Sequence, residues 1–232
     1  MQPIDQKRLI QAIQNTPLKS PQQAKLMSRA DASGLYQIAY EQYTRLWQRF
    51  PQDAYANLRR GEAAEDYWEY ATRPDVHQLS IVAPQAQELF QVARDCLTEA
   101  KKRAPNNAST NLAYGRYLFW YGSQMPKGLS YIKKAIALDP KSYAAHATLG
   151  AAYAEHSGVA YNLPLAEKEL KTAVAIDPTA AYPHWRLIRV YLDEGGQQNA
   201  RRELQAYVKL TPPSDMQTRV INSYQNVFDH SR

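Results

Sequence analysis

Two stretches of the chain end in the same way, and this repetition constrains the fold more than any other feature. The segment AIALDP ends at Pro140 and the segment AVAIDP ends at Pro178. Proline has no backbone N–H and disfavours helix in the residue before it, so both segments are predicted to be the last turns of helices. Two helices that end with nearly the same six residues, 38 positions apart, indicate an internal repeat.

The phase of this repeat extends over most of the chain. Prolines that could close successive repeats are Pro51, Pro105, Pro140, Pro178 and Pro212, which are separated by 54, 35, 38 and 34 residues. Twelve positions before each proline the residue is small, namely Ala39, Ala93, Gly128, Ala166 and Ala200. Eight positions before it the residue is large, namely Tyr43, Leu97, Ile132, Leu170 and Leu204. Small residues let two helices approach closely and large ones fill the space between repeats, so the pattern predicts stacked helix pairs.

This pattern resembles the tetratricopeptide repeat, a helix-turn-helix unit of about 34 residues. The best copy is HATLGAAY, with Leu149, Gly150 and Tyr153, followed by LAEKELKTAVAIDP, with Ala166 and Leu170. The resemblance covers residues 39–212 and is clearest in the last three repeats. It implies an all-α fold, a right-handed superhelical solenoid of helix-turn-helix repeats with a C-terminal capping helix.

The proline spacing also predicts the organisation of the chain. We expect an N-terminal helical segment over 1–33, which includes a weakly amphipathic helix over 4–15, then repeats over 34–212 and a capping helix within 213–232 that begins at Ser214. The 54-residue interval predicts long helices near 53–72 and 84–104, joined by a loop over 73–83. The 38-residue interval places an insertion at HSGVAYNLP, between the two helices of one repeat, where a solenoid tolerates extra residues. Ser142 and Thr179 are predicted to cap the helices that follow the two Asp-Pro turns.

Composition narrows the function classes only a little. The net charge of +6 and pI of about 9.2 favour acidic partners or anionic surfaces, but they are too modest to indicate nucleic acid. The chain has neither an apolar run of roughly 20 residues nor the apolar core of a signal peptide. We therefore expect a soluble protein with a cytoplasmic location by default. The alternative is an exported protein whose signal was removed. Cys96 is the one cysteine, so an internal disulfide is excluded.

Motifs for catalysis are missing from the sequence. No pair of histidines has the spacing of a helical zinc motif, and His146 and His184, which share a repeat position, are interpreted as packing residues. A glycine-rich phosphate loop and a nucleophile elbow are also missing. Cys96 is interpreted as a core residue. The sequence predicts a protein that is not an enzyme and that has no metal and no cofactor.

The concave surface of the solenoid is where the resemblance implies binding, and first-helix residues line it. The predicted partner-binding residues are Arg116, Phe119, Trp120, Tyr182, Trp185, Arg186 and Arg189, which would face one another across a floor of alanines in the fourth repeat. Aromatic and arginine side chains dominate binding energy at interfaces. Packing within the core is the competing interpretation of the aromatic residues. A stripe of acidic residues, Glu62, Glu65, Asp66 and Glu69, is interpreted as a solvated face, with a recognition surface as the alternative.

The leading hypothesis is a non-enzymatic adaptor that holds a peptide or helix segment of another protein in this groove, with an acidic segment as one option. The set of groove residues that binds chaperone C-termini in some members of the family is missing, because Leu58 and Glu62 occupy two of its positions. An RNA-binding repeat protein is one alternative, suggested by the charge and by Lys101-Lys102-Arg103 and Arg201-Arg202. A small-ligand or transport-associated module with a pocket under the 73–83 loop is the other.

Overall fold

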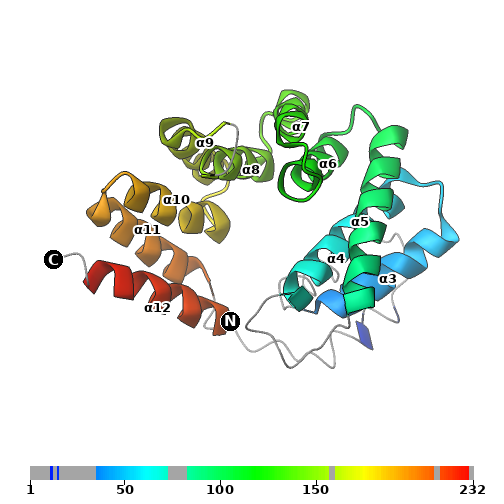
Figure 1. Ribbon diagram of the computed structural model, residues 1–232, viewed down its shortest axis with the longest axis horizontal. Helices are drawn as coiled ribbons and strands as arrows, with labels where there is room; N and C mark the ends of the chain where they lie inside the picture. Colours follow the sequence, from blue (N-terminus) through cyan, green and yellow to red (C-terminus); the bar gives the residue numbers. More distant parts are fainter. Residues whose placement is uncertain are drawn as a thin grey trace. The chain divides into compact units, whose positions relative to one another are not determined.

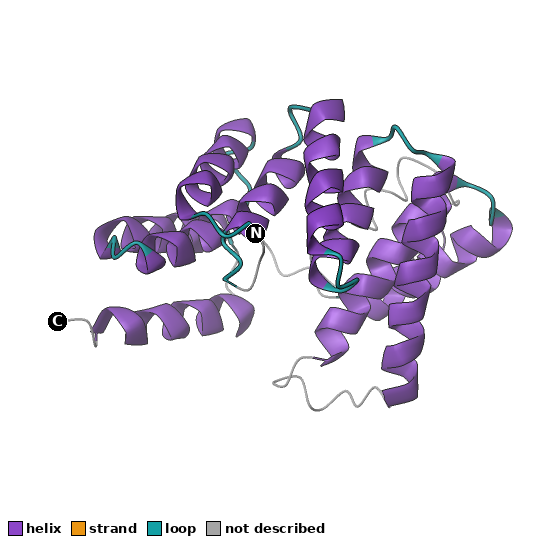
Figure 2. Ribbon diagram, turned by 45° about the horizontal axis from the view of Figure 1, so that its top comes forward, coloured by secondary structure: helices purple, strands orange, loops and turns teal. Residues whose placement is uncertain are grey.

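The described part of the chain consists of helices and short connections (Figures 1 and 2). The computed structural model describes residues 11–12, 15, 35–72, 83–156, 160–211 and 215–229, and no strand occurs within these ranges. The chain divides into two compact units, residues 1–117 and 118–232. No helix in the described ranges is long and apolar enough to cross a membrane.

Between residues 35 and 117, the described part of unit 1 contains three long helices and the beginning of a fourth. The helices are α3 (Tyr36–Arg49), α4 (Ala54–Thr72), α5 (Ala83–Arg103) and α6 (Ala108–Trp120), which crosses the boundary between the units. Small buried residues such as Ala64 and Ala93 let α4 and α5 lie close together. At Gly61 of α4, an added Cβ would lie 2.8 Å from Leu97 Cγ of α5, so only glycine fits there without displacing the leucine.

Unit 2 continues the helix pairs. It contains α7 (Met125–Leu138), α8 (Tyr143–Tyr153), α9 (Leu163–Ile176), α10 (Ala181–Asp193), α11 (Gln197–Leu210) and α12 (Asp215–Asp229). Helices α8 and α9 form one pair and α10 and α11 the next. A Cβ at Gly150 of α8 would lie 2.6 Å from Leu170 Cγ and 3.0 Å from the Ala166 carbonyl oxygen of α9. The small positions Gly150 and Ala166 therefore lie at the approach inside this pair, as predicted. Leu170, one of the large residues predicted to fill the space between repeats, instead lies against Gly150 within the pair.

The repeated Asp-Pro pairs have a hydrogen-bonding role beyond ending a helix. The Asp139 carboxylate accepts the backbone N–H of Lys141 at 3.1 Å, and the Asp177 carboxylate accepts that of Thr179 at 2.9 Å. The hydroxyl of Thr179 also donates to Asp177, and this bond, followed by the backbone bond, lowers the pKa of Asp177. Aspartate before proline therefore builds the turn as well as ending the helix.

Cap predictions had mixed outcomes. The Ser142 side chain accepts a hydrogen bond from the Ala145 backbone N–H, so the predicted cap of α8 is confirmed. The prediction for Thr179 was wrong, because the N-cap of α10 is Ala180 and the Thr179 hydroxyl is bonded to Asp177 instead.

The helix predictions are confirmed where the structure describes them. The two long helices of the second repeat are α4 and α5, and the final helix is α12. Two predicted parts lie mostly or fully outside the described residues. The first is the segment 1–33, with most of the helix predicted over 4–15, and the second is the loop over 73–82.

One polar position, six residues after the turn proline, ties three of the repeats to the turn before them. The Asn57 amide donates to the Pro51 carbonyl at 2.9 Å, and the Asn111 amide donates to the Pro105 carbonyl at 2.9 Å. In the next repeat, His146 Nε2 lies 3.2 Å from the Pro140 carbonyl oxygen and Nδ1 lies 2.7 Å from a Glu169 carboxylate oxygen. The histidine that the sequence indicated as a packing residue is therefore also a hydrogen-bonding residue.

We expect His146→Leu to destabilise the protein by about 1 to 2 kcal/mol, because the Pro140 carbonyl and Glu169 both lose a partner. His146→Asn, which copies the Asn57 and Asn111 arrangement, should recover part of this loss by restoring the bond to the proline carbonyl. Thermal unfolding of the three proteins measures the difference. Equal stabilities for the leucine and asparagine variants would contradict the assigned role of the carbonyl bond.

Candidate functional site

The candidate site is one face of α10. The side chains of this face recur at spacings that bring them to the same side of the helix. They are Tyr182, Trp185, Arg186, Arg189 and Asp193. The opposite side is apolar and packs into unit 2, where Leu187, Ile188, Val190 and Tyr191 are buried. This burial fixes the rotation of α10, so the stripe of aromatic and charged residues is held in place by the core beneath it.

The aromatic end of the stripe is accessible. The rings of Tyr182 and Trp185 meet edge to face, with centroids 5.8 Å apart, and 42% of Tyr182 is exposed. The Arg186 guanidinium lies 5.8 Å from the centroid of the Trp185 ring, near the outer limit of a cation–π contact. This end of α10 offers a broad apolar surface next to a cation.

Arg186 overturns the prediction of an open alanine floor. Its Nη2 donates to the Ala151 carbonyl of α8 at 3.4 Å, and its Nε is buried without a hydrogen-bond partner in the described part of the chain. The floor residues Ala147, Ala151 and Ala154 are each at most 2% exposed. The floor prediction was wrong because these small residues are contact points between neighbouring helices, and a methyl side chain is easily covered there.

The charged end of the stripe extends onto the segment inserted between α8 and α9. His156 Nε2 lies 3.0 Å from the Asp193 carboxylate, and the Arg189 Nε lies 3.9 Å from the same group. Tyr161 stacks on His156, with ring centroids 4.8 Å apart. Sequence reasoning missed these two aromatic residues. The signal that could have found them is the four-residue excess of this repeat, which marked the segment but not its contact with α10.

Tyr224 of helix α12 is close enough to the stripe to interact with its side chains. Burial raises the pKa of Tyr224, while Arg186, Arg189 and a hydrogen bond with Trp185 lower it, so its hydroxyl lies beside the stripe. The helix is held on α11 because Arg201 donates to the Phe228 carbonyl at 3.2 Å and its guanidinium covers the Phe228 ring at 4.4 Å. Tyr224 was not predicted, because the expected role of the terminal helix was only to cover the end of the stack.

The other three predicted site residues have different surroundings. Phe119 is only 1% exposed and packs edge-on against Trp120, with centroids 4.8 Å apart, so it offers almost no surface to a partner. Trp120 is half-buried. Arg116 belongs to unit 1, where it is already paired within the chain. The four residues of α10 are therefore the part of the prediction that the structure brings together.

Arg116 is bound by the acidic stripe of α4. Its guanidinium donates to both carboxylate oxygens of Glu65, at 3.0 and 3.2 Å, and lies 4.0 Å from Asp66. The side chain of Glu65 is only 5% exposed, and burial raises its pKa to about 7 although Arg116 opposes the shift. Burial also raises the pKa of Asp66. Interpreting Glu65 as part of a solvated face was wrong, because a basic residue from the next repeat makes its burial tolerable.

Solved structures contain helix pairs of this kind. In such pairs small residues lie where the two helices come closest, and a proline lies at the turn. A thermophilic TPR protein of Thermus thermophilus, TTC0263, matches with a TM-score of 0.65 and 17% identity over 87% of this chain and 96% of its own. The chain has the tetratricopeptide-repeat fold. PilW, a type IV pilus biogenesis factor, matches this repeat protein with a TM-score of 0.57 and 21% identity over 88% of this chain and 87% of its own. MamA matches with a TM-score of 0.50 and 15% identity over 79% of this chain and 93% of its own.

No protein-family model matches the sequence of this tetratricopeptide-repeat chain, and no curated protein matches it. The likeness is therefore one of fold. Within the described ranges, no three histidine, cysteine, aspartate or glutamate side chains are grouped as a metal site would require.

Proposed function

We propose that the protein is a non-enzymatic adaptor that holds a segment of another protein on the α10 face of unit 2. The observation that carries the proposal is the combination of Tyr182, Trp185 and Arg189 on one fixed helix face. Tyr182 is 42% exposed and the Arg189 side chain is 45% exposed, so both can contact a partner. Tyrosine, tryptophan and arginine are the residues most often responsible for binding energy at protein interfaces.

The charges of the face favour an acidic residue in the bound segment. Arg186 forms no ion pair with any described residue, and the one ion-pair partner of Arg189 within the described ranges is Asp193, at 3.9 Å. A carboxylate placed between these two arginines would gain charge-assisted hydrogen bonds. An apolar side chain next to it could pack on Tyr182 and Trp185. Protein binding on surfaces formed by successive repeats is also the general use of solenoid folds.

RNA binding receives less support, because several cations that suggested it have intramolecular partners. Arg103 lies 2.6 Å from Glu99, and Lys102 lies 3.8 Å from the same carboxylate. Arg201 holds Phe228 of α12. Neutralised cations contribute little to binding of phosphates.

The double variant Trp185→Ala with Arg189→Ala tests the site. We expect it to weaken capture of the protein's partners by about 2 kcal/mol or more, roughly 30-fold in Kd, if both residues are hot spots. Affinity capture from the source cell with quantitative mass spectrometry, followed by binding measurements on the captured protein, gives the readout.

Lys141→Ala with Tyr143→Ala is the matched control. It also removes an exposed cation and an exposed aromatic ring of unit 2, but at the turn between α7 and α8. A Trp185/Arg189 variant that retained every partner of the wild-type protein, at unchanged affinity, would rule out the α10 face as the binding site.

A further inference from the structure

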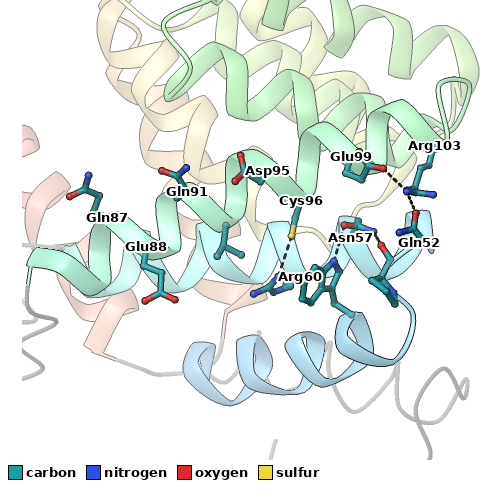
Figure 3. A pocket seen from close by; sticks show the side chains of 13 residues that line it. Gln52, Asn57, Arg60, Gln87, Glu88, Gln91, Asp95, Cys96, Glu99 and Arg103 are labelled. Carbon is teal, nitrogen blue, oxygen red and sulfur yellow. Dashed lines mark hydrogen bonds and ion pairs between the residues drawn. The ribbon is translucent and has the colours of Figure 1, made fainter.

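Unit 1 contains a cleft that the predictions did not include. It has a volume of about 720 Å³ and is bounded by the end of α3, the turn after it, α4 and residues 87–103 of α5 (Figure 3). Its residues from α5 form two rows. The outer row is Gln87, Gln91, Asp95, Glu99 and Arg103, and the inner row is Glu88, Val92 and Cys96.

The outer row is a ladder of hydrogen-bonding side chains. Its members are four residues apart and follow one another along α5 in Figure 3. Four residues of α-helix rise by ~6 Å, and two residues of an extended chain span ~6.6 Å. The spacing between successive members of the ladder is therefore close to the spacing between main-chain groups on one side of an extended peptide. The two spacings stay in register over three or four members of the ladder. Gln87 and Gln91 have no hydrogen-bond partner among the described residues, so their amides are available to such a chain.

From Gln87 to Arg103 the ladder is ~24 Å long. An extended chain at ~3.3 Å per residue would place about seven residues along the ladder.

The floor of the cleft carries a cation, Arg60. Arg60 lies over the Trp47 ring at 4.1 Å and contacts the Thr44 hydroxyl at 3.3 Å and the Cys96 sulfur at 3.8 Å. Within the described ranges it forms no ion pair. Burial raises the pKa of Cys96, so the neighbouring thiol stays neutral at physiological pH and does not balance the charge of Arg60.

The two acidic members of the ladder have ion-pair partners on α5. Asp95 is paired with Arg94 at 2.9 Å, and Glu99 with Arg103 at 2.6 Å, so neither would strongly repel a carboxylate. Glu88 has no ion pair with a described residue and stands eight positions before Cys96, ~12 Å along α5. With respect to the described residues, the cleft therefore presents an unpaired anion near one end and an unpaired cation further along.

We propose that this cleft binds an extended segment of a protein partner, in which an acidic side chain contacts Arg60 and a basic residue about four positions away contacts Glu88. The Gln87 and Gln91 amides bind the main chain of the segment, and an apolar side chain packs on Trp47 and Val92. This site is separate from the α10 face and does not depend on the function proposed for it.

Selection of a displayed library of random twelve-residue peptides on the full chain tests the proposal. We expect enriched peptides that combine an acidic and a basic residue about four positions apart and that accept proline between them. Synthetic peptides of the enriched sequences should lose at least tenfold in affinity with Arg60→Gln. The same peptides should bind the Trp185→Ala, Arg189→Ala variant as well as they bind the wild-type protein.

Arg60→Gln also removes the stacking on Trp47, so a second variant separates binding from folding. Gln87→Ala with Gln91→Ala changes only exposed side chains of the rim and should weaken the same peptides several-fold, with thermal unfolding unchanged. Peptides that bind both variants as tightly as the wild-type protein would overturn the proposal. A selection that yields only peptides sensitive to the α10 variant, or no peptide at all, would also overturn it.

Discussion

Arg116→Met is expected to destabilise the protein by about 3 kcal/mol or more at pH 8, because it leaves Glu65 buried without its ionic partner. Glu65 is on α4 and Arg116 is on α6, so the substitution also removes a link between successive repeats. The Glu65 side chain is only 5% exposed, and solvent therefore replaces little of the lost interaction. Denaturant unfolding followed by helical circular dichroism measures the difference.

The loss should be much smaller at pH 5, about 1 kcal/mol. In the folded protein the pKa of Glu65 is raised from 4.5 to about 7, so at pH 5 the carboxyl is already neutral in the wild-type protein. A carboxyl whose pKa is higher in the folded state contributes stability that is present below about pH 4.5 and is lost as the pH rises through 7. For Glu65 this loss amounts to about 3 kcal/mol in the wild-type protein. Asp66, whose pKa is also raised, contributes in the same direction.

Glu65→Gln is the control for this interpretation. It has nearly the same shape but cannot ionise, so the fall in stability between pH 4.5 and pH 7 should be reduced. An Arg116→Met variant equally destabilised at pH 5 and pH 8 would show that packing of the arginine stem, and not the charge of Glu65, determines the effect.

Leu170→Ala is expected to destabilise unit 2 by about 2 to 5 kcal/mol, because it opens a cavity in the contact between α8 and α9. Leu170 is fully buried, and its Cγ occupies the space next to Gly150. Thermal unfolding should show a clear decrease in Tm. Leu165→Ala on the same helix is the matched control, since 38% of Leu165 is exposed and its loss should cost little.

A double-mutant cycle with Gly150→Ala tests the packing directly. Alone, Gly150→Ala should destabilise by about 1 to 3 kcal/mol, because its Cβ would lie 2.6 Å from Leu170 Cγ. In the Leu170→Ala background this cost should decrease, because the side chain in the way has been shortened. If the effects of the two substitutions are additive, Leu170 does not limit the size of the side chain at position 150. The limit is then set by the Ala166 carbonyl oxygen alone, which would lie 3.0 Å from the new methyl group.

Residues that define the repeat were predictable because their roles are local. The phase set by Pro140 and Pro178 depends on rules for neighbouring residues in a helix or turn, and it placed the small residues Gly150 and Ala166 at the approach of two helices. It placed Leu170 between repeats, whereas Leu170 lies against Gly150 within one helix pair. The same phase predicted α4, α5 and α12 close to their observed bounds.

The candidate site was less predictable because it depends on contacts between repeats. The repeat position of Ala151 indicates a groove, yet whether Arg186 lies across it depends on the spacing of two helices that no short-range rule determines. The contact of His156 with Asp193 likewise depends on the path of an inserted segment. The burial of Glu65 requires an arginine 51 residues further along the chain.

The turn between α7 and α8 makes several hydrogen bonds within itself. Between Asp139 and His146, the bonds join Asp139 to Lys141, Ser142 to Ala145 and His146 to Pro140, all within eight residues. Removing residues 141–178 would join Pro140 directly to Thr179 and so restore the Asp-Pro-Thr sequence of the following turn. A gene encoding this protein could therefore lose or gain one whole repeat by recombination at these turns without a new joint having to evolve.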